Sequence, residues 1–477
     1  MSVETTVSAE NPWGVARAAD SLNELAYIER ATAHVLAGWI PRIPDMTVKV
    51  AAGQSLYHAI DRATRLRARR DGLTRASATE LDVPRGWRLV MQHVDSASDA
   101  SAMLAGLSGV VWPGLIELYR RHFASADLLG DAESVHLVTG LLPDVSSALD
   151  GIRAALERGA VSSKGAPTTP EVLAFVEEVE ALWESRAQGP LLPSSDSLWP
   201  PLSRVPAAAR PAGLERCEPG SLGILTVDSL REPGDVGRFL HSDLDEEYTT
   251  LELMARNSYE HPDMPWQFHR DMARQASDEA RHALMMEALL LARGFKYGDF
   301  PISTSSYDGL YKFGPCEPGS RKELLWRMLI RQTFMEGLAL DSLAHEIKRR
   351  EGAGQDDIVR ALDYILRDEI FHVRSGMQWS AYLMGGDRHA ILQERYEALT
   401  WQTNAGDETR ARFVENNLEK AMAELEILDE GHRRRGGKPP DRPLNRMGRL
   451  QAGLNDDDIL QVLSWGYATE APASEPA

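Results

Sequence analysis

The stretch ASDEARHALM (residues 276–285) lies within a long helical pattern and carries Asp278, Glu279 and His282 on an otherwise apolar, Met-rich run. Glu279 and His282 are three positions apart, so they project from one face of a helix and can reach one point in space. A single Glu-x-x-His match is expected by chance in a Glu-rich chain with 13 histidines. The stretch decides the fold only if the rest of the chain supplies partners for it.

The chain contains a second copy of this motif. RDEIFHV (residues 367–373) repeats the order of acids and imidazole with Asp368, Glu369 and His372. The two copies lie on two separate predicted helices. They therefore supply two carboxylates and two imidazoles that can face one another across the core of a helical bundle.

An acidic residue precedes each motif at nearly the same distance. Glu247 lies 32 positions before Glu279, and Glu336 lies 33 positions before Glu369. A predicted turn falls midway between the members of each pair. At a rise of about 1.5 Å per residue, equal distances on either side of a turn bring both residues to one height in a helical hairpin.

Two other acids compete with Glu247 on the same predicted helix. Glu252 is expected to lie several residues too close to the turn, and Glu246 is expected to point about 100° away around the helix. The spacing therefore favours Glu247.

Two lone glutamates and two Glu-x-x-His motifs, all facing inward from four helices, form the ligand set of a carboxylate-bridged dinuclear metal centre. Four carboxylates neutralise two divalent cations, and two imidazoles add one nitrogen donor per metal. Without a metal, the same carboxylates would be costly to bury, and the alternative is a set of surface salt bridges. The expected ligands are Glu247, Glu279, His282, Glu336, Glu369 and His372. Asp278 and Asp368 are expected to accept a hydrogen bond from the histidine of the opposite motif and so to orient its ring.

Composition and charge narrow the class of protein. A net charge of −19 would repel a phosphate backbone, so no nucleic-acid partner is expected. Two cysteines, Cys217 and Cys316, cannot form a disulfide framework and indicate a reduced compartment. The N-terminus lacks the pattern of a signal peptide, and no apolar run approaches the ~20 residues that span a bilayer. We therefore expect a cytoplasmic protein with no membrane partner.

Helical periodicity dominates the chain and strand signals are sparse, which predicts an all-α protein. Prolines are dense between residues 189 and 220 and predict an extended linker there. Four parts are expected: an N-terminal helical bundle without a metal site (1–160), a Pro-rich linker with one helix at 171–185 (161–232), the metal-binding bundle (233–431), and a C-terminal extension with a disordered tail (432–477).

The motifs DEARH and DEIFH, with the two upstream acids, resemble the ferritin-like di-iron carboxylate superfamily over Gly237 to about Leu383. YGDFP (297–301) and KPPDRPLNRMGRLQAG (438–453) are similar to a ferritin-like family without a settled general function. The resemblance implies a ferritin-like four-helix bundle with two iron ions. The ligand set also admits Mn/Fe and Mn/Mn pairs.

The N-terminal block echoes the same spacing and is either a degenerate ferritin-like copy or a coincidence. Glu29 and Asp61 are 32 positions apart, and Glu117 and Asp150 are 33 apart. Thr64 and Arg153 stand where histidines would be needed, so this copy is expected to bind no metal. Glu133 and His136 in AESVHL form a Glu-x-x-His match without a partner motif and are expected to be structural.

The leading functional hypothesis is an O2-activating dinuclear iron oxygenase that hydroxylates or N-oxygenates a small organic molecule, with O2 as co-substrate. The hypothesis allows an external electron donor and a homodimer. The alternatives are a ferroxidase or iron-binding ferritin-like protein, a manganese-catalase-like enzyme, and a scaffold with a vestigial metal site. The superfamily spans many reactions, so the residues do not identify the substrate.

Overall fold

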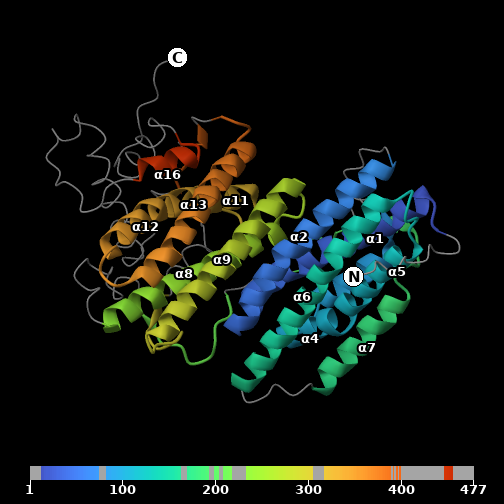
Figure 1. Cartoon of the computed structure of the whole chain (residues 1–477), viewed down its shortest axis with the longest axis horizontal. Coiled ribbons are helices and arrows are strands. Elements are labelled where there is room, and N and C mark those ends of the chain that lie inside the picture. The colour runs from blue at the N-terminus through green and yellow to red at the C-terminus, as the bar shows by residue number, and fades with distance from the viewer. Residues whose placement is uncertain are drawn as a thin grey trace, which may run out of the picture. The chain divides into compact units, whose positions relative to one another are not determined.

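The computed structural model describes residues 12–74, 82–162, 169–192, 198–202, 208–217, 233–303, 316–387, 390–391, 394–395, 397–398 and 445–454. Over these residues the chain is almost entirely helical (Figure 1). Strands are limited, within the described part, to the two-residue segments β1 (Val83–Pro84), β2 (Leu191–Leu192), β3 (Arg216–Cys217) and β4 (Ile302–Ser303). The all-α class expected from helical periodicity is confirmed.

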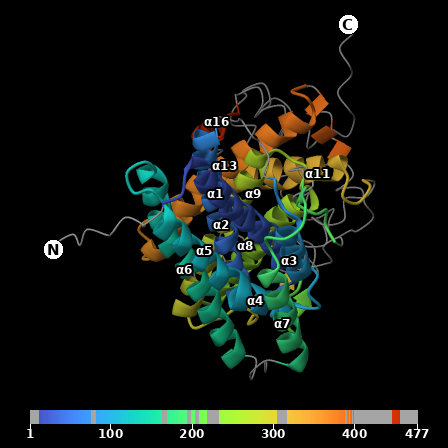
Figure 2. The same ribbon diagram turned by 90° about the vertical axis from the view of Figure 1, so that its right-hand side faces the viewer.

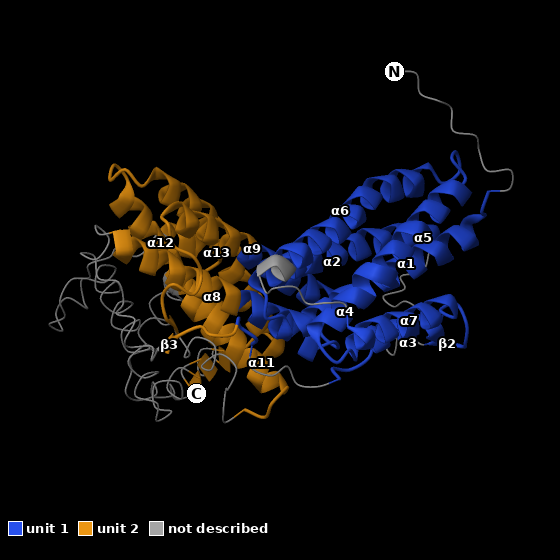
Figure 3. Ribbon diagram, turned by 90° about the horizontal axis from the view of Figure 1, so that it is seen from below, with its two compact units in different colours: residues 1–211, 250–280 blue, residues 212–249, 281–477 orange. Residues whose placement is uncertain are grey.

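The chain divides into two compact units, coloured separately in Figure 3. Unit 1 comprises residues 1–211 and 250–280, and unit 2 comprises residues 212–249 and 281–477. The division therefore runs through the helices α8 (Pro233–Glu260) and α9 (Trp266–Ala292). The linear division expected from the sequence keeps both helices in one part of the chain.

Close packing explains why residues 250–280 belong to unit 1. Residues 251–259 are buried on every side of α8. Gly53, on α2 (Met46–Thr74), permits this packing, because a Cβ atom there would lie 2.6 Å from the Leu251 side chain. Glu252 also forms a buried ion pair with Lys49 of α2.

Unit 1 is built around the hairpin of α1 (Val15–Trp39) and α2, which lie side by side in Figures 1 and 2. The second half of α1 is buried on nearly all faces, as is typical of a central helix. The remaining helical segments of the unit pack around this hairpin or on one another. They are η1 (Ile40–Arg42), α3 (Arg85–Asp95), α4 (Ala100–Gly106), the π-helix η2 (Leu107–Val111), α5 (Trp112–Ser125), α6 (Ala132–Ser162) and α7 (Pro170–Glu184).

The helix expected at 171–185 is confirmed as α7. Thr169 accepts a hydrogen bond from the backbone N–H of Val172 and so caps the first turn. Figure 2 shows α7 beside α4, and it also packs against α3. This helix is therefore a packed part of unit 1, although the sequence around it is rich in proline.

The segment Ala100–Ser125, which spans α4, η2 and α5, is long and apolar enough to cross a membrane by length and composition. Within the described residues it is the one candidate of this kind, and 67% of its most apolar window is buried inside the structure. The core helix of a soluble protein meets the same criterion, and this burial fits such a helix.

Unit 2 contains the first part of α8 and the last part of α9. Its other helical segments are α11 (Arg321–Arg327), the π-helix η6 (Met328–Met335), α12 (Glu336–Arg350), α13 (Asp356–Leu383) and α16 (Arg446–Gln451). The first three follow one another without a break, and α12 and α13 pack together as a hairpin. The strands β3 and β4 pair in parallel, with Arg216 opposite Ile302.

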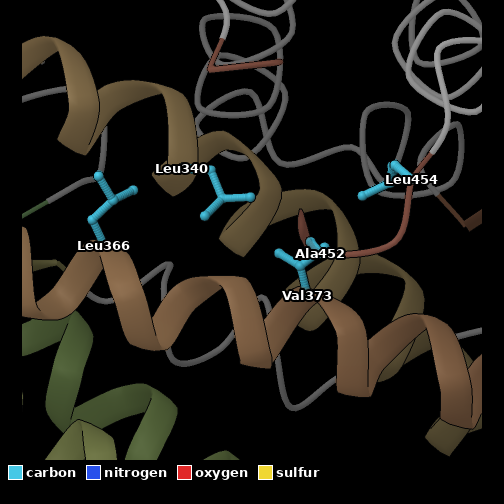
Figure 4. Close-up of a cluster of buried hydrophobic side chains, with 5 residues drawn as sticks. All are labelled: Leu340, Leu366, Val373, Ala452 and Leu454. Carbon is cyan, nitrogen blue, oxygen red and sulfur yellow. The ribbon is translucent and has the colours of Figure 1, made fainter. Parts of the chain in front are cut away.

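The C-terminal segment Asn445–Leu454 packs onto α12 and α13. Figure 4 shows the shared apolar cluster, which consists of Leu340, Leu366, Val373, Ala452 and Leu454. Arg449 forms a buried ion pair with Asp341 of α12, and the Asn445 backbone N–H donates to Asp341 Oδ1 at 2.8 Å. The region KPPDRPLNRMGRLQAG is thus, in its described part, integral to unit 2. The rest of the expected C-terminal extension (432–444 and 455–477), including its tail, lies outside the described residues.

Candidate metal centre

Two groups of carboxylates and imidazoles that could hold a metal ion occur among the described residues. The first consists of Glu247, Glu279 and His282, and the second of Glu279, Glu369 and His372. Within each group, one possible ligand atom from every residue lies within 4.8 Å of the others. Five of the six residues expected from the sequence are therefore brought together. Glu279 belongs to both groups, so its carboxylate lies where it could bridge two cations.

The ligand atoms of these groups are withdrawn from solvent. Glu279, Glu369, His282 and His372 are all at most 3% exposed, while Glu247 is half-buried. Glu279 and His282 come from neighbouring turns of α9, as Glu369 and His372 do on α13. Gln275, one turn before Glu279, donates a hydrogen bond to its Oε1 atom at 3.1 Å. Burial of this many carboxylates is costly unless a cation neutralises them.

The two ring nitrogens of His282 face different partners. Its Nδ1 atom lies 3.4 Å from Glu247 Oε2 and 3.9 Å from Glu369 Oε1. Its Nε2 atom lies 3.1 Å from Asp368 Oδ2. When Nε2 donates its proton to this carboxylate, the lone pair of Nδ1 is directed to the side where the other carboxylates lie. That is the tautomer a metal-binding imidazole needs.

Asp368 remains ionised beside His282. Burial raises the pKa of this carboxyl, but hydrogen bonds from His282 and Arg281 outweigh burial and lower the pKa to about 2. The Arg281 guanidinium donates to Asp368 Oδ2 at 2.6 Å. The contact expected between Asp368 and the histidine of the opposite motif is therefore present.

The matching contact expected of Asp278 stays a prediction. Asp278 Oδ2 lies 3.8 Å from Arg274 Nε, on the same helix. His372 Nδ1 lies 3.0 Å from Glu369 Oε2. The rings of His282 and His372 have their centroids 6.0 Å apart, so the two imidazoles occupy one small region.

The sixth expected ligand, Glu336, lies outside both groups. It is the first residue of α12, is 5% exposed, and has its Oε1 atom 3.3 Å from Arg331 Nε. Arg331 Nη1 also lies 3.2 Å from Glu246 Oε2. Sequence reasoning missed Arg331, because a residue five positions before a glutamate does not share its face in an α-helix.

The two alternatives to Glu247 have other partners. Glu246 contacts Arg331, as described above, and Glu252 is fully buried in unit 1, where Lys49 and Arg210 both pair with it. Two cations thus already neutralise Glu252. The hairpin arithmetic therefore selected the acid that lies beside His282.

Negative charge is concentrated near Glu247. Asp243 lies one turn before it on α8, and burial together with the nearby Glu247 and Glu346 raises the pKa of Asp243 well above its usual value. Arg350 opposes this shift without cancelling it. A bound cation would relieve the same repulsion.

In the N-terminal block, the residue that meets the buried Glu29 is the neighbour of Asp61. Arg62, not Asp61, faces Glu29: its Nε and Nη2 atoms lie 2.7 and 2.9 Å from the two carboxylate oxygens. Tyr119 donates a third hydrogen bond to Glu29 at 2.9 Å. Asp61 instead lies at the surface, 3.9 Å from Arg65. The core acid of this block is thus neutralised by an arginine.

The other N-terminal candidates also lie apart from any such cluster. Glu117 and Asp150 are exposed, Thr64 accepts a hydrogen bond from the Trp266 indole, and Arg153 donates to the Ser108 carbonyl. Glu133 is exposed and pairs with Arg69, and His136 is exposed as well. The unpaired Glu-x-x-His match therefore lies on the surface of α6.

Comparison with known proteins places the chain in a family. A family described as "Protein of unknown function (DUF455)" matches residues 169–429, more than half of the chain, and the chain belongs to it. Over 128 residues the chain is 30% identical to an "Uncharacterized protein" of Haemophilus influenzae (strain Rd). That match covers 26% of this chain and 41% of the relative, so the chain spans less than half of the relative's length. No solved structure matches the chain.

Proposed function

We propose that this member of the DUF455 family is a dinuclear iron oxidoreductase that uses O2 to hydroxylate or N-oxygenate a small organic molecule. The observation that supports the proposal best is the pair of buried ligand groups that share Glu279. Their donor set of carboxylate oxygens and imidazole nitrogens suits iron and manganese. Because these residues lie on α8, α9 and α13, with Glu336 on α12, the proposal includes a ferritin-like four-helix bundle.

Each residue has a distinct part in holding the metals. Glu247 and His282 would hold one iron ion, Glu369 and His372 the other, and Glu279 would lie between them. Glu336 would complete the second position. Bound iron supplies the redox chemistry by which O2 oxidises an unactivated C–H bond or an amine nitrogen.

The residues around the ligands orient them and keep water away from them. Asp368 holds the proton on His282 Nε2, which keeps Nδ1 free of a proton. Arg281 keeps Asp368 ionised and fixed in place. Burial of Glu279, Glu369 and His372 keeps water away from the ligands, so that their charges act in a low dielectric.

The overall reaction fixes which partners are required. One oxygen atom of O2 would enter the substrate and the other would leave as water, which takes two electrons and two protons. The substrate would be oxidised by giving up the other two of the four electrons that reduce O2. An external electron donor is therefore part of the proposal, together with a small-molecule substrate.

The test is metal analysis followed by O2 consumption. Full-length protein is loaded with Fe(II) without oxygen, desalted, and analysed for metal, and O2 uptake is then followed with a chemical reductant and a panel of amines and alkanes. We expect a stoichiometry close to two irons per chain and O2 uptake that depends on the organic substrate.

Each rival function predicts a different outcome of the same test. Uptake of tens of irons per chain without substrate would indicate iron storage and contradict the proposal. Rapid loss of hydrogen peroxide from Mn-loaded protein would indicate a manganese catalase. Two tightly bound metals with no redox activity toward any compound would indicate a scaffold with a vestigial site.

A further inference from the structure

We infer that Arg331 is an internal counter-cation for Glu336 that competes with the second metal ion, so that the two metal positions bind with unequal affinity. The inference rests on the proposed dinuclear site and adds a property that neither the motifs nor the family assigns. It concerns one side chain of η6 and its two carboxylate partners.

The guanidinium of Arg331 is placed between two acids. It lies 3.3 Å from Glu336 and 3.2 Å from Glu246, and the residue is 8% exposed. A guanidinium stays protonated in proteins, so its positive charge persists at every pH at which the protein is folded. Glu336 is therefore already partly neutralised before any metal arrives.

The π-helical geometry of η6 makes this contact possible. Positions five apart on an α-helix point about 140° away from each other, whereas the wider π-turn brings positions i and i+5 together. Arg331 and Glu336 have this spacing, and Thr333 donates to the Met328 carbonyl, also five positions back, at 2.8 Å. Insertions of this kind occur often at functional sites.

Packing against α13 holds the π-helix in this position. Gly376 faces η6 so closely that a Cβ atom there would lie 2.6 Å from the Gln332 Cβ atom and 3.1 Å from Thr333 Oγ1. Gln332 and Thr333 are buried at this contact. The turn that carries Arg331 is thereby fixed to the same helix that carries Glu369 and His372.

The two metal positions consequently differ in charge. Glu247, Glu279 and His282 form one complete three-residue group, and Glu279, Glu369 and His372 form the other. Glu336 is the additional ligand expected at the second group, and it remains with Arg331. A cation entering there must draw Glu336 away from the arginine or share it. We therefore expect the first group to fill before the second.

The experiment is a titration of metal-free, full-length protein with Co(II), a probe that does not react with O2 under these conditions. Calorimetry and visible absorption report the binding steps. Wild-type protein should bind two ions in two resolved steps. Arg331→Gln removes the positive charge and should tighten the second step by about tenfold, the size typical of residues next to metal ligands.

Three further variants separate a charge effect from a loss of structure. Arg331→Lys keeps the charge and should keep two resolved steps. Glu246→Gln removes the charge that Arg331 shares with Glu246 and should weaken the second step. Arg367→Gln removes an exposed arginine of α13, which pairs with Asp363 at 3.3 Å, and should leave both steps unchanged.

The possible failures are distinct. Two equal steps in the wild type, or an Arg331→Gln second step that is unchanged or weaker, would overturn the role of Arg331 while leaving the metal site standing. Absence of Co(II) binding would overturn both this inference and the proposed function. Two resolved steps that respond as expected, in a protein that consumes no O2, would overturn the oxygenase alone.

Discussion

The α1–α2 hairpin and the helices of the candidate metal centre both bury glutamate carboxylates, but they surround them with different side chains. Glu29 and Arg62 are 33 positions apart, the spacing that also separates Glu336 from Glu369. In the first case a buried carboxylate meets a guanidinium and a tyrosine hydroxyl; in the second region carboxylates meet other carboxylates and imidazoles. In the first arrangement the charge of Glu29 is neutralised by a residue of the chain itself. For the second we propose a bound cation.

The sequences of the two regions can be aligned on these buried residues. DRATR (61–65) aligns with DEARH (278–282) without a gap, which places Arg62 at the position of Glu279 and Arg65 at that of His282. At this position an arginine supplies Glu29 with a counter-charge, whereas Glu279 adds a further carboxylate to its cluster. The partner of a buried glutamate therefore decides whether its charge is neutralised within the chain.

The largest expected effect tests the buried ion pair of Glu29 and Arg62 in unit 1. Arg62→Met leaves Glu29 buried without its counter-charge and should lower the free energy of unfolding by about 3–5 kcal/mol. The double variant Glu29→Gln, Arg62→Met should recover a large part of that loss, because it removes both charges. Urea denaturation of wild type, the single variants Arg62→Met and Glu29→Gln, and the double variant measures the coupling. A single variant that is as stable as wild type would contradict the assigned role of the ion pair.

The second effect tests the hydrogen bond that orients His282. Asp368→Asn keeps the size of the side chain and removes its charge, and it should weaken metal affinity by about 10–100-fold. Asp278→Asn tests the corresponding role predicted for the other motif. Asp363→Asn is the matched control, since Asp363 lies on the same helix and is 56% exposed. Equal metal affinities for Asp368→Asn and this control would exclude an orienting role.

The third effect concerns buried imidazoles, which also differ between the regions. Burial, with smaller contributions from His269 and Arg30, lowers the pKa of His34 in unit 1 to about 3. The unfolded chain then binds more protons than the folded one between about pH 6.5 and pH 3, so stability falls as the pH falls through that window. His34 should contribute about 1 kcal/mol of this loss between pH 6.5 and 5.5.

His34→Gln should remove that part of the pH dependence, while His136→Gln, at an exposed position, should keep it. Urea denaturation at the two pH values measures both slopes. An unchanged slope in His34→Gln would show that the imidazole is already charged in the folded protein.

The smallest expected effect tests whether Arg62, and not the adjacent Asp61, is the residue that stabilises the core of unit 1. Asp61→Ala removes an acid that is 36% exposed and only loosely paired with Arg65, so it should change stability by less than about 0.5 kcal/mol. A loss comparable to that of Arg62→Met would mean that Asp61, one position earlier, is the residue that matters in this core.

Local patterns were enough to predict the helical class, α7 and five residues that come together. The Glu-x-x-His motifs and the hairpin spacing depend only on helix geometry, which the chain obeys regularly around α9 and α13. Arg331 could not be predicted, because the π-helical turn that brings it to Glu336 has no reliable signature in one sequence.

Contacts between residues far apart in the sequence could not be predicted either. Lys49 and Glu252 are 203 positions apart, and Asp341 and Arg449 are 108 apart. Neither pair leaves a periodic signal, yet the first helps to explain why residues 250–280 belong to unit 1 and the second fixes the C-terminal segment on α12. The burial of Arg62 beside the more exposed Asp61 has the same origin, since adjacent polar residues differ only in which face the packing buries.

The most direct test of the central claim is the metal content of Glu279→Ala after anaerobic loading with Fe(II), compared with wild type and with the exposed control Glu117→Ala. Both Glu117→Ala and wild type should hold close to two irons per chain. Glu279→Ala should lose at least one, and its metal-free form should unfold no more easily than metal-free wild type, because one of several repelling carboxylates has gone. Full metal content in Glu279→Ala, or no bound iron in wild type, would contradict the claim that these buried carboxylates exist to hold cations.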